Sequence, residues 1–154
     1  MTKVNSISRE IEFSAAHVLL GHDKCGRMHG HNYRGRVTIE GPMAKTGMVY
    51  DYNLISEIVK GFDHVVILPN EPASMKINIE FASAPQIEWG DYRFPASDVI
   101  VIPFKHTTAE NIAKCLAQHI VGIGIENGYR VVRIVIELWE NERSSVVVEA
   151  KEGD

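Results

Sequence analysis

HGHNYRGRVTIE, residues 29–40, is the segment from which the architecture of this chain can be worked out. Apolar Tyr33, Val37 and Ile39 alternate there with arginine, threonine and glutamate side chains. Because successive side chains of a β-strand point to opposite faces, this alternation predicts a strand with one covered and one solvated face. The dipeptide Gly41-Pro42 ends the strand, since proline has no backbone N–H to offer to a sheet.

A second strand precedes this one over residues 4–17. Its apolar side chains fall in phase with one another, at Ile7, Ile11, Phe13 and Ala15. The connecting residues 18–28 contain two glycines and many polar side chains, which is typical of a loop. We therefore expect an antiparallel hairpin with a long loop, of the kind that carries functional residues.

Two helices and two further strands follow. The helix after Asp51 buries side chains spaced three and four apart: Leu54, Ile55, Ile58, Val59 and Phe62. The other helix begins at Thr107 or Thr108, where Thr107 and Glu110 have the spacing of a capping box, and turns Ile112, Ala113, Leu116 and Ile120 inward. Residues 131–140 then predict a strand and 146–149 its return partner. The sequence thus predicts an α+β fold, an antiparallel four-stranded sheet with two helices on one face.

The segment 71–103 is harder to assign, because four prolines interrupt its short apolar runs. A loop of this length without structure is uncommon in a compact domain. We treat residues 1–154 as a single domain with an inserted extension at about 71–103, for which a hairpin is one possible form.

The composition excludes several classes of protein. The chain has 154 residues, a mass of 17.2 kDa and a net charge of −4, which argues against a general nucleic-acid binder. It has no apolar run long enough to cross a membrane and no apolar leader at its start, which favours a cytoplasmic protein. Two cysteines cannot form a disulfide framework, and this indicates a reducing compartment.

Three histidines are predicted to share one face of the hairpin. His29 and His31 lie two apart on the second strand, in phase with Tyr33, and His17 lies in phase with Phe13. Unpaired imidazoles in an apolar layer are costly, and a metal ion would satisfy them. Three neutral nitrogens suit catalytic zinc with an open fourth position, although iron, manganese and copper remain open at this point. The alternative is that these are ordinary histidines at strand ends.

Cys25 and the pair Asp63-His64 are candidates for proton transfer. Cys25 lies in the loop 18–28 beside Lys24 and Arg27, and cationic neighbours favour the reactive thiolate. It could instead be a fourth metal ligand or an inert loop thiol. A carboxylate next to an imidazole can tune a proton-transfer group, although such pairs are common at helix ends.

Glu140 ends the strand 131–140 in phase with its apolar residues, whereas Glu137 lies on the other face. The phase directs Glu140 toward the side that holds the histidines. A carboxylate there can accept two hydrogen bonds from an amidine-like N–C–N edge, although a solvated residue at a strand end is the plain alternative.

These residues belong to an ordered series of short motifs. The series is FSAAH (13–17), CxxxHGHNY (25–33), GMVxDY (47–52), Asp63-His64, TTAEN (107–111) and Trp139-Glu140. It closely resembles the 6-pyruvoyltetrahydropterin synthase / 6-carboxytetrahydropterin synthase family, over roughly residues 4–70 and 104–150. The spacing from Cys25 to His29, together with Asp51, is closer to the carboxy-forming members of the queuosine pathway.

The resemblance implies a tunnelling fold (T-fold), in which sheets close a barrel when subunits assemble, commonly as a hexamer (a dimer of trimers) with active sites at the interfaces. It assigns one zinc ion per subunit to His17, His29 and His31, proton transfer to Cys25, Asp63 and His64, and pterin binding to Glu140, Thr107 and Thr108. For Thr107 the capping role is an equally good account.

The implied activity is that of a lyase. It would convert 7,8-dihydroneopterin triphosphate to 6-carboxy-5,6,7,8-tetrahydropterin, acetaldehyde and triphosphate, on the route to 7-deazapurines such as queuosine or archaeosine. The alternatives are a 6-pyruvoyltetrahydropterin synthase and a non-catalytic metal- or pterin-binding module. The insertion and His106 depart from both enzyme groups.

Overall fold

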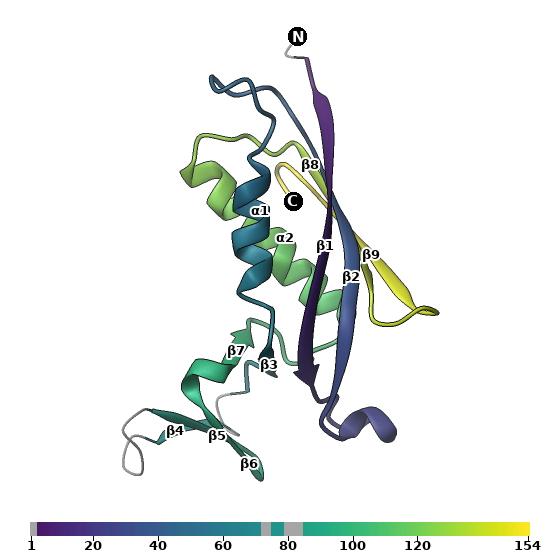
Figure 1. The fold of residues 1–154 in the computed structure, drawn as a ribbon, viewed down its shortest axis with the longest axis vertical. Helices are drawn as coiled ribbons and strands as arrows, with labels where there is room; N and C mark the ends of the chain where they lie inside the picture. Colours follow the sequence, from purple (N-terminus) through teal and green to yellow (C-terminus); the bar gives the residue numbers. More distant parts are fainter. Residues whose placement is uncertain (1–2, 72–74, 79–84) are drawn as a thin grey trace.

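The computed structural model describes residues 3–71, 75–78 and 85–154, and its main element is a long, twisted six-stranded sheet (Figure 1). The strands of this sheet lie in the order β7-β3-β1-β2-β8-β9. Their bounds are Asn5–His17 (β1), His29–Gly41 (β2), Val65–Pro69 (β3), Val99–Ile102 (β7), Arg133–Trp139 (β8) and Ser145–Lys151 (β9).

The hairpin predicted from the alternating segments is confirmed. β1 and β2 pair antiparallel without interruption, from Asn5 opposite Gly41 to His17 opposite His29. β8 joins β2 and β9 joins β8, both antiparallel, so these strands form the predicted antiparallel four-stranded unit. The register places the buried Phe13 and Tyr33 opposite each other on the covered face.

The strand count needs a correction, because two more strands extend the sheet beyond β1. β3 pairs parallel with β1, and β7 pairs parallel with β3. Both are short apolar runs without alternation, which periodicity alone does not separate from other buried segments, although Val101 on β7 is exposed. β7 also shows that the end of the segment 71–103 belongs to the main sheet.

The two helices cover the same face of the sheet (Figure 1). Asp51 caps α1 (Tyr52–Lys60) by accepting a hydrogen bond from the backbone N–H of Asn53. Thr108 caps α2 (Ala109–Glu126) by accepting from the N–H of Asn111. The α2 side chains predicted to face inward are all buried in the core: Ile112, Ala113, Leu116 and Ile120. Among the described residues, no helix has the length and hydrophobicity needed to cross a bilayer.

A second, small sheet lies within the predicted extension and projects from one end of the molecule (Figure 1). Its strands are antiparallel, in the order β4 (Met75–Asn78), β5 (Gln86–Trp89) and β6 (Tyr92–Pro95). Trp89 is buried against Val18 and Leu68, so this sheet packs against the residue that follows His17. The rest of the predicted extension, at 72–74 and 79–84, lies outside the described residues.

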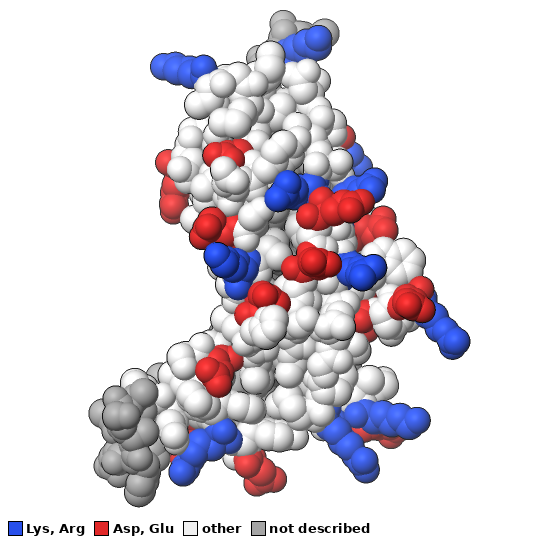
Figure 2. Space-filling model, in the orientation of Figure 1, with Lys and Arg blue, Asp and Glu red and all other residues white. Residues whose placement is uncertain are grey.

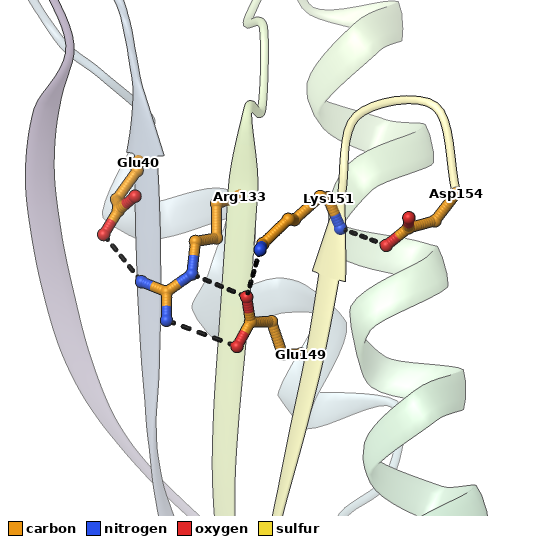
Figure 3. A network of polar contacts seen from close by, with 5 residues as sticks. All are labelled: Glu40, Arg133, Glu149, Lys151 and Asp154. Carbon is orange, nitrogen blue, oxygen red and sulfur yellow. Dashed lines mark hydrogen bonds and ion pairs between the residues drawn. The ribbon is translucent and has the colours of Figure 1, made fainter.

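The opposite face of the main sheet is polar. Arg133 on β8 binds Glu40 on β2 and Glu149 on β9, so one guanidinium links three strands (Figure 3). Lys151 also pairs with Glu149, while its backbone N–H donates to Asp154. Acidic and basic side chains are interspersed on the face that Figure 2 shows.

Candidate metal centre

Three imidazoles meet where the β1–β2 hairpin ends, on its covered face. The register sets His17 directly opposite His29, and His31 opposite Ala15. The ring centroid of His17 lies 4.6 Å from that of His29 and 5.1 Å from that of His31. The ring centroids of His29 and His31 are 4.9 Å apart. One nitrogen from each ring falls within 4.8 Å of the others. The predicted convergence is confirmed.

Backbone carbonyls set the orientation of two of these rings. The Nδ1 of His17 lies 2.6 Å from the carbonyl oxygen of Thr107, and the Nδ1 of His29 lies 2.7 Å from that of Arg27. A carbonyl oxygen can only accept, so each Nδ1 must carry the hydrogen. Each Nε2 therefore keeps a free lone pair, which is the arrangement found in histidines that bind metals.

His17 supplies the strongest sign that the cluster holds a cation. Its side chain is fully buried, and its Nε2 has no hydrogen-bond partner among the described residues. A buried nitrogen lone pair without a partner is costly, and a metal ion would satisfy it. The donor set of three imidazoles, two of them fixed by carbonyls, thus fits a metal ion.

The surroundings of His17 and His31 favour the neutral imidazole, which is the form that binds metals. Burial lowers the pKa of His17 to about 4; the hydrogen bond to Thr107 opposes this shift and the two neighbouring imidazoles add to it. Burial also lowers the pKa of His31, against the opposing charge of Glu140.

Thr107 does not cap the second helix, so the capping box predicted for Thr107 and Glu110 is wrong. The helix is capped by Thr108, one residue later. Thr107 is buried, its hydroxyl donates to the carbonyl of Val18 at 2.9 Å, and its own carbonyl accepts from His17. These two bonds tie the start of α2 to the end of β1 and leave Thr107 outside the helix. No local signal indicates this role, since a carbonyl is common to every residue.

Cys25 lies in the loop that joins the two metal-binding strands. It is half-buried within a 3-10 helix, Lys24–Gly26, and its carbonyl accepts a hydrogen bond from the N–H of Leu19 at 2.7 Å. Among the described residues, the ligand atoms gathered at the centre come from the three histidines alone. In this geometry the Cys25 thiol is not one of the gathered ligand atoms.

Asp63 and His64 form a pair beyond the other edge of β1. The Asp63 carboxylate accepts from the N–H of Ser14 at 2.8 Å and lies 2.9 Å from the Nδ1 of His64. These bonds, that from Ser14 first, hold the pKa of Asp63 below its usual value. His64 adopts a φ of 57°, uncommon for a non-glycine residue, while its N–H donates to the carbonyl of Ser14.

Within the described part of the chain, this pair is not among the ligand atoms that gather at the imidazoles. His64 borders a shallow depression of about 410 Å³ whose lining also includes Ser14, Asn32 and His31. The side chains of Ser14 and Asn32 point to the face opposite the imidazoles, because they alternate along β1 and β2 with His17 and His31. The exposed His64 therefore lies beside the hairpin that carries the imidazoles, at the edge of β1.

Glu140 lies on the face of the imidazoles, as its phase predicted. It directly follows β8 and is half-buried, and its charge acts on both His31 and Tyr33. Glu137 lies on the exposed face, where it accepts a hydrogen bond from the indole of Trp139 at 2.7 Å. A carboxylate and a group of neutral imidazoles therefore face the same space.

The fold and the centre define a T-fold domain with a cluster of three histidines that could hold a metal ion. Two solved structures share this fold: 6-pyruvoyl tetrahydropterin synthases from Plasmodium vivax (TM-score 0.70, 23% identity, 97% of this chain and 99% of that one) and Plasmodium falciparum (TM-score 0.67, 23% identity, 96% and 98%). The sequence model of the family described as 6-pyruvoyl tetrahydropterin synthase matches residues 6–151. The chain belongs to this family, which supports an enzyme of the lyase type.

Curated relatives carry the name of one branch of the family. A Pyrococcus abyssi protein named as a candidate 6-carboxy-5,6,7,8-tetrahydropterin synthase is 37% identical over 153 residues, covering 94% of this chain and 92% of that protein. A Rickettsia felis 6-carboxy-5,6,7,8-tetrahydropterin synthase is 33% identical over 120 residues, covering 73% and 78%.

Proposed function

We propose that this protein is a zinc-dependent 6-carboxytetrahydropterin synthase. It converts 7,8-dihydroneopterin triphosphate and one molecule of water to 6-carboxy-5,6,7,8-tetrahydropterin, acetaldehyde and triphosphate, in the biosynthesis of 7-deazapurines such as queuosine. The observation that carries the proposal is the buried, unpartnered Nε2 of His17 within a cluster of neutral imidazoles. The names of the curated relatives and the three-residue spacing between Cys25 and His29 favour the carboxy product.

Asp51 contributes no support for this choice of product. It resembled the carboxy-forming group in sequence, but its side chain caps α1 through the N–H of Asn53 at 2.8 Å. Helix capping is a sufficient reason for an aspartate at this position.

Each group at the site has a distinct task in the proposed reaction. Zinc held by the three histidines would supply Lewis acidity toward the hydroxyl groups of the substrate side chain. Cys25, as the thiolate, takes a proton from a side-chain carbon, and His64, oriented by Asp63, relays a second proton. Glu140 accepts hydrogen bonds from the N–C–N edge of the pterin ring, with Thr108 beside it.

The exposed side chain of His64, at the edge of β1, supports an assembled active site. We propose that a neighbouring subunit supplies Asp63 and His64, in a hexamer of two trimers whose sheets close barrels. Among the described residues, β9 is the last strand of the sheet and β1 pairs with β3 at Ala15 and Ala16 alone, so both strands offer edges to a second copy. Light scattering that returned the mass of a single chain would contradict this assembly.

Identification of the products tests the function directly. The zinc-loaded protein is incubated with 7,8-dihydroneopterin triphosphate, and the pterin product is identified by mass spectrometry while acetaldehyde is trapped as a hydrazone. We expect the carboxy product and acetaldehyde in equal amounts. The pyruvoyl product without acetaldehyde would favour a 6-pyruvoyltetrahydropterin synthase. Binding without turnover would favour a non-catalytic module.

Replacing Glu140 by glutamine is expected to weaken binding of 7,8-dihydroneopterin by about tenfold to a hundredfold. Hydrogen bonds to a charged group contribute about 1.5–3 kcal/mol, and the neutral amide keeps the shape of the side chain but loses the charge. Calorimetric titration measures the dissociation constant. Glu137→Gln on the opposite face is the matched control and should bind like wild type; equal affinities for the two variants would contradict the anchoring role.

A further inference from the structure

The hydroxyl of Tyr33 is buried without a hydrogen-bond partner among the described residues. The side chain of Tyr33 is 0% exposed, and its oxygen is a buried polar atom with nothing to bond. Tyr50, which is 2% exposed, shows the usual solution, because its hydroxyl donates to the carbonyl of Ile120 at 2.7 Å. An unpaired buried hydroxyl is costly, so the one on Tyr33 calls for an explanation.

Tyr33 lies between the metal centre and Glu140. It shares the covered face of β2 with His31, whose ring centroid is 5.4 Å away, and its other neighbour Phe13 stacks on it at 4.8 Å. The ladder between β2 and β8 ends at Arg34 and Trp139, so Tyr33 and Glu140 are the next residues on two neighbouring strands. Tyr33 thus connects the two halves of the site.

The hydroxyl of Tyr33 is suited to donate a hydrogen bond. A phenol hydroxyl carries its proton at neutral pH and can therefore donate it to a carboxylate oxygen. A carboxylate has about four lone-pair positions. Two N–H groups of a pterin edge would use two of them, which leaves room for one more donor at Glu140.

We propose that Tyr33 is a positioning residue whose hydroxyl donates to the Glu140 carboxylate when a pterin is bound, and so fixes the orientation in which that carboxylate receives the ring. The inference rests on the proposed function, because it takes Glu140 as the pterin anchor. It explains why a polar atom without a partner is kept beside the site: its partner is a carboxylate that the ligand brings into place.

The test is the substitution Tyr33→Phe, which keeps the ring that stacks on Phe13 and removes only the hydroxyl. With the zinc-loaded protein, we expect the dissociation constant of 7,8-dihydroneopterin to rise by about tenfold, while zinc stoichiometry and melting temperature stay at wild-type levels. Tyr50→Phe is the matched control. It loses a satisfied hydrogen bond in the core, so its melting temperature should fall while its affinity for the pterin is unchanged.

A double-mutant cycle with Glu140→Gln separates positioning from a general structural effect. If Tyr33 acts through Glu140, adding Tyr33→Phe to Glu140→Gln should produce little further loss of affinity. Additive losses, or an unchanged affinity in Tyr33→Phe alone, would overturn the inference while leaving the proposed function intact. If wild-type protein binds no 7,8-dihydroneopterin, the proposed function fails and the inference fails with it.

Discussion

Replacing His29 by alanine is expected to abolish stoichiometric metal binding. The variant keeps only two of the three imidazoles that converge on the centre, and a catalytic zinc site needs three protein ligands. Changes to residues that merely orient a ligand cost about 10–100-fold in metal affinity. Losing a ligand itself should therefore cost at least about 100-fold. Competitive titration with a chromophoric chelator measures the affinity, and elemental analysis after dialysis measures the metal content.

His119→Ala is the matched control for this prediction. His119 lies on α2, where its Nδ1 is engaged with the carbonyl of Cys115 at 2.8 Å, and it does not belong to the cluster. The control should keep one metal ion per chain. Full metal content in the His29 variant would show that the ligand assignment is wrong, even if its activity were lost.

Replacing Cys25 by alanine is expected to remove turnover while metal stays bound. A positioned acid or base contributes about 10²–10⁴-fold to a rate, so kcat for release of triphosphate should fall by that factor. The imidazoles are held by the hairpin register and by the carbonyls of Thr107 and Arg27, none of which needs the thiol. Stopped assays for kcat, together with elemental analysis, give both quantities on one preparation.

Cys115→Ala distinguishes the loop thiol from cysteine chemistry in general. Cys115 is buried in the core on α2, and burial raises the pKa of its thiol to about 11, so it stays protonated and unreactive at neutral pH. The Cys115 variant should lose stability but keep its kcat. A Cys25 variant with wild-type kcat would eliminate the thiolate base, and one that lost its metal would make Cys25 a ligand instead.

The hairpin at the centre of the fold is predictable because apolar and polar residues alternate along its strands. The hairpin of β1 and β2 has one covered face and one solvated face, so period-two patterns were enough to find its two strands and their antiparallel pairing, with bounds within one residue. β3 and β7 carry no such pattern, since both are uniformly apolar, even at the exposed Val101. Their place in the sheet depends on packing against β1, which only the folded chain specifies.

In the candidate site, too, sequence patterns predict the features that local strand geometry sets and miss those that depend on the folded chain. The spacing of His29 and His31, and the phase of His17 and Glu140, place these side chains on one face, because strand geometry is local. The carbonyl of Thr107 accepts a hydrogen bond from His17, which is distant in sequence. Every residue has a backbone carbonyl, so the sequence does not indicate this contact. The place of Asp63-His64 beside the backbone of Ser14 is likewise a result of how β3 joins the edge of β1.

X-ray absorption spectroscopy of the zinc-loaded wild-type protein, with no substrate present, tests the assignment of the metal ligands. We expect a first coordination shell of nitrogen and oxygen alone, at about 2.0–2.1 Å, with the outer-shell scattering of three imidazole rings. A sulfur scatterer at about 2.3 Å would place Cys25 in the coordination shell and remove the free thiol on which the proposed reaction depends.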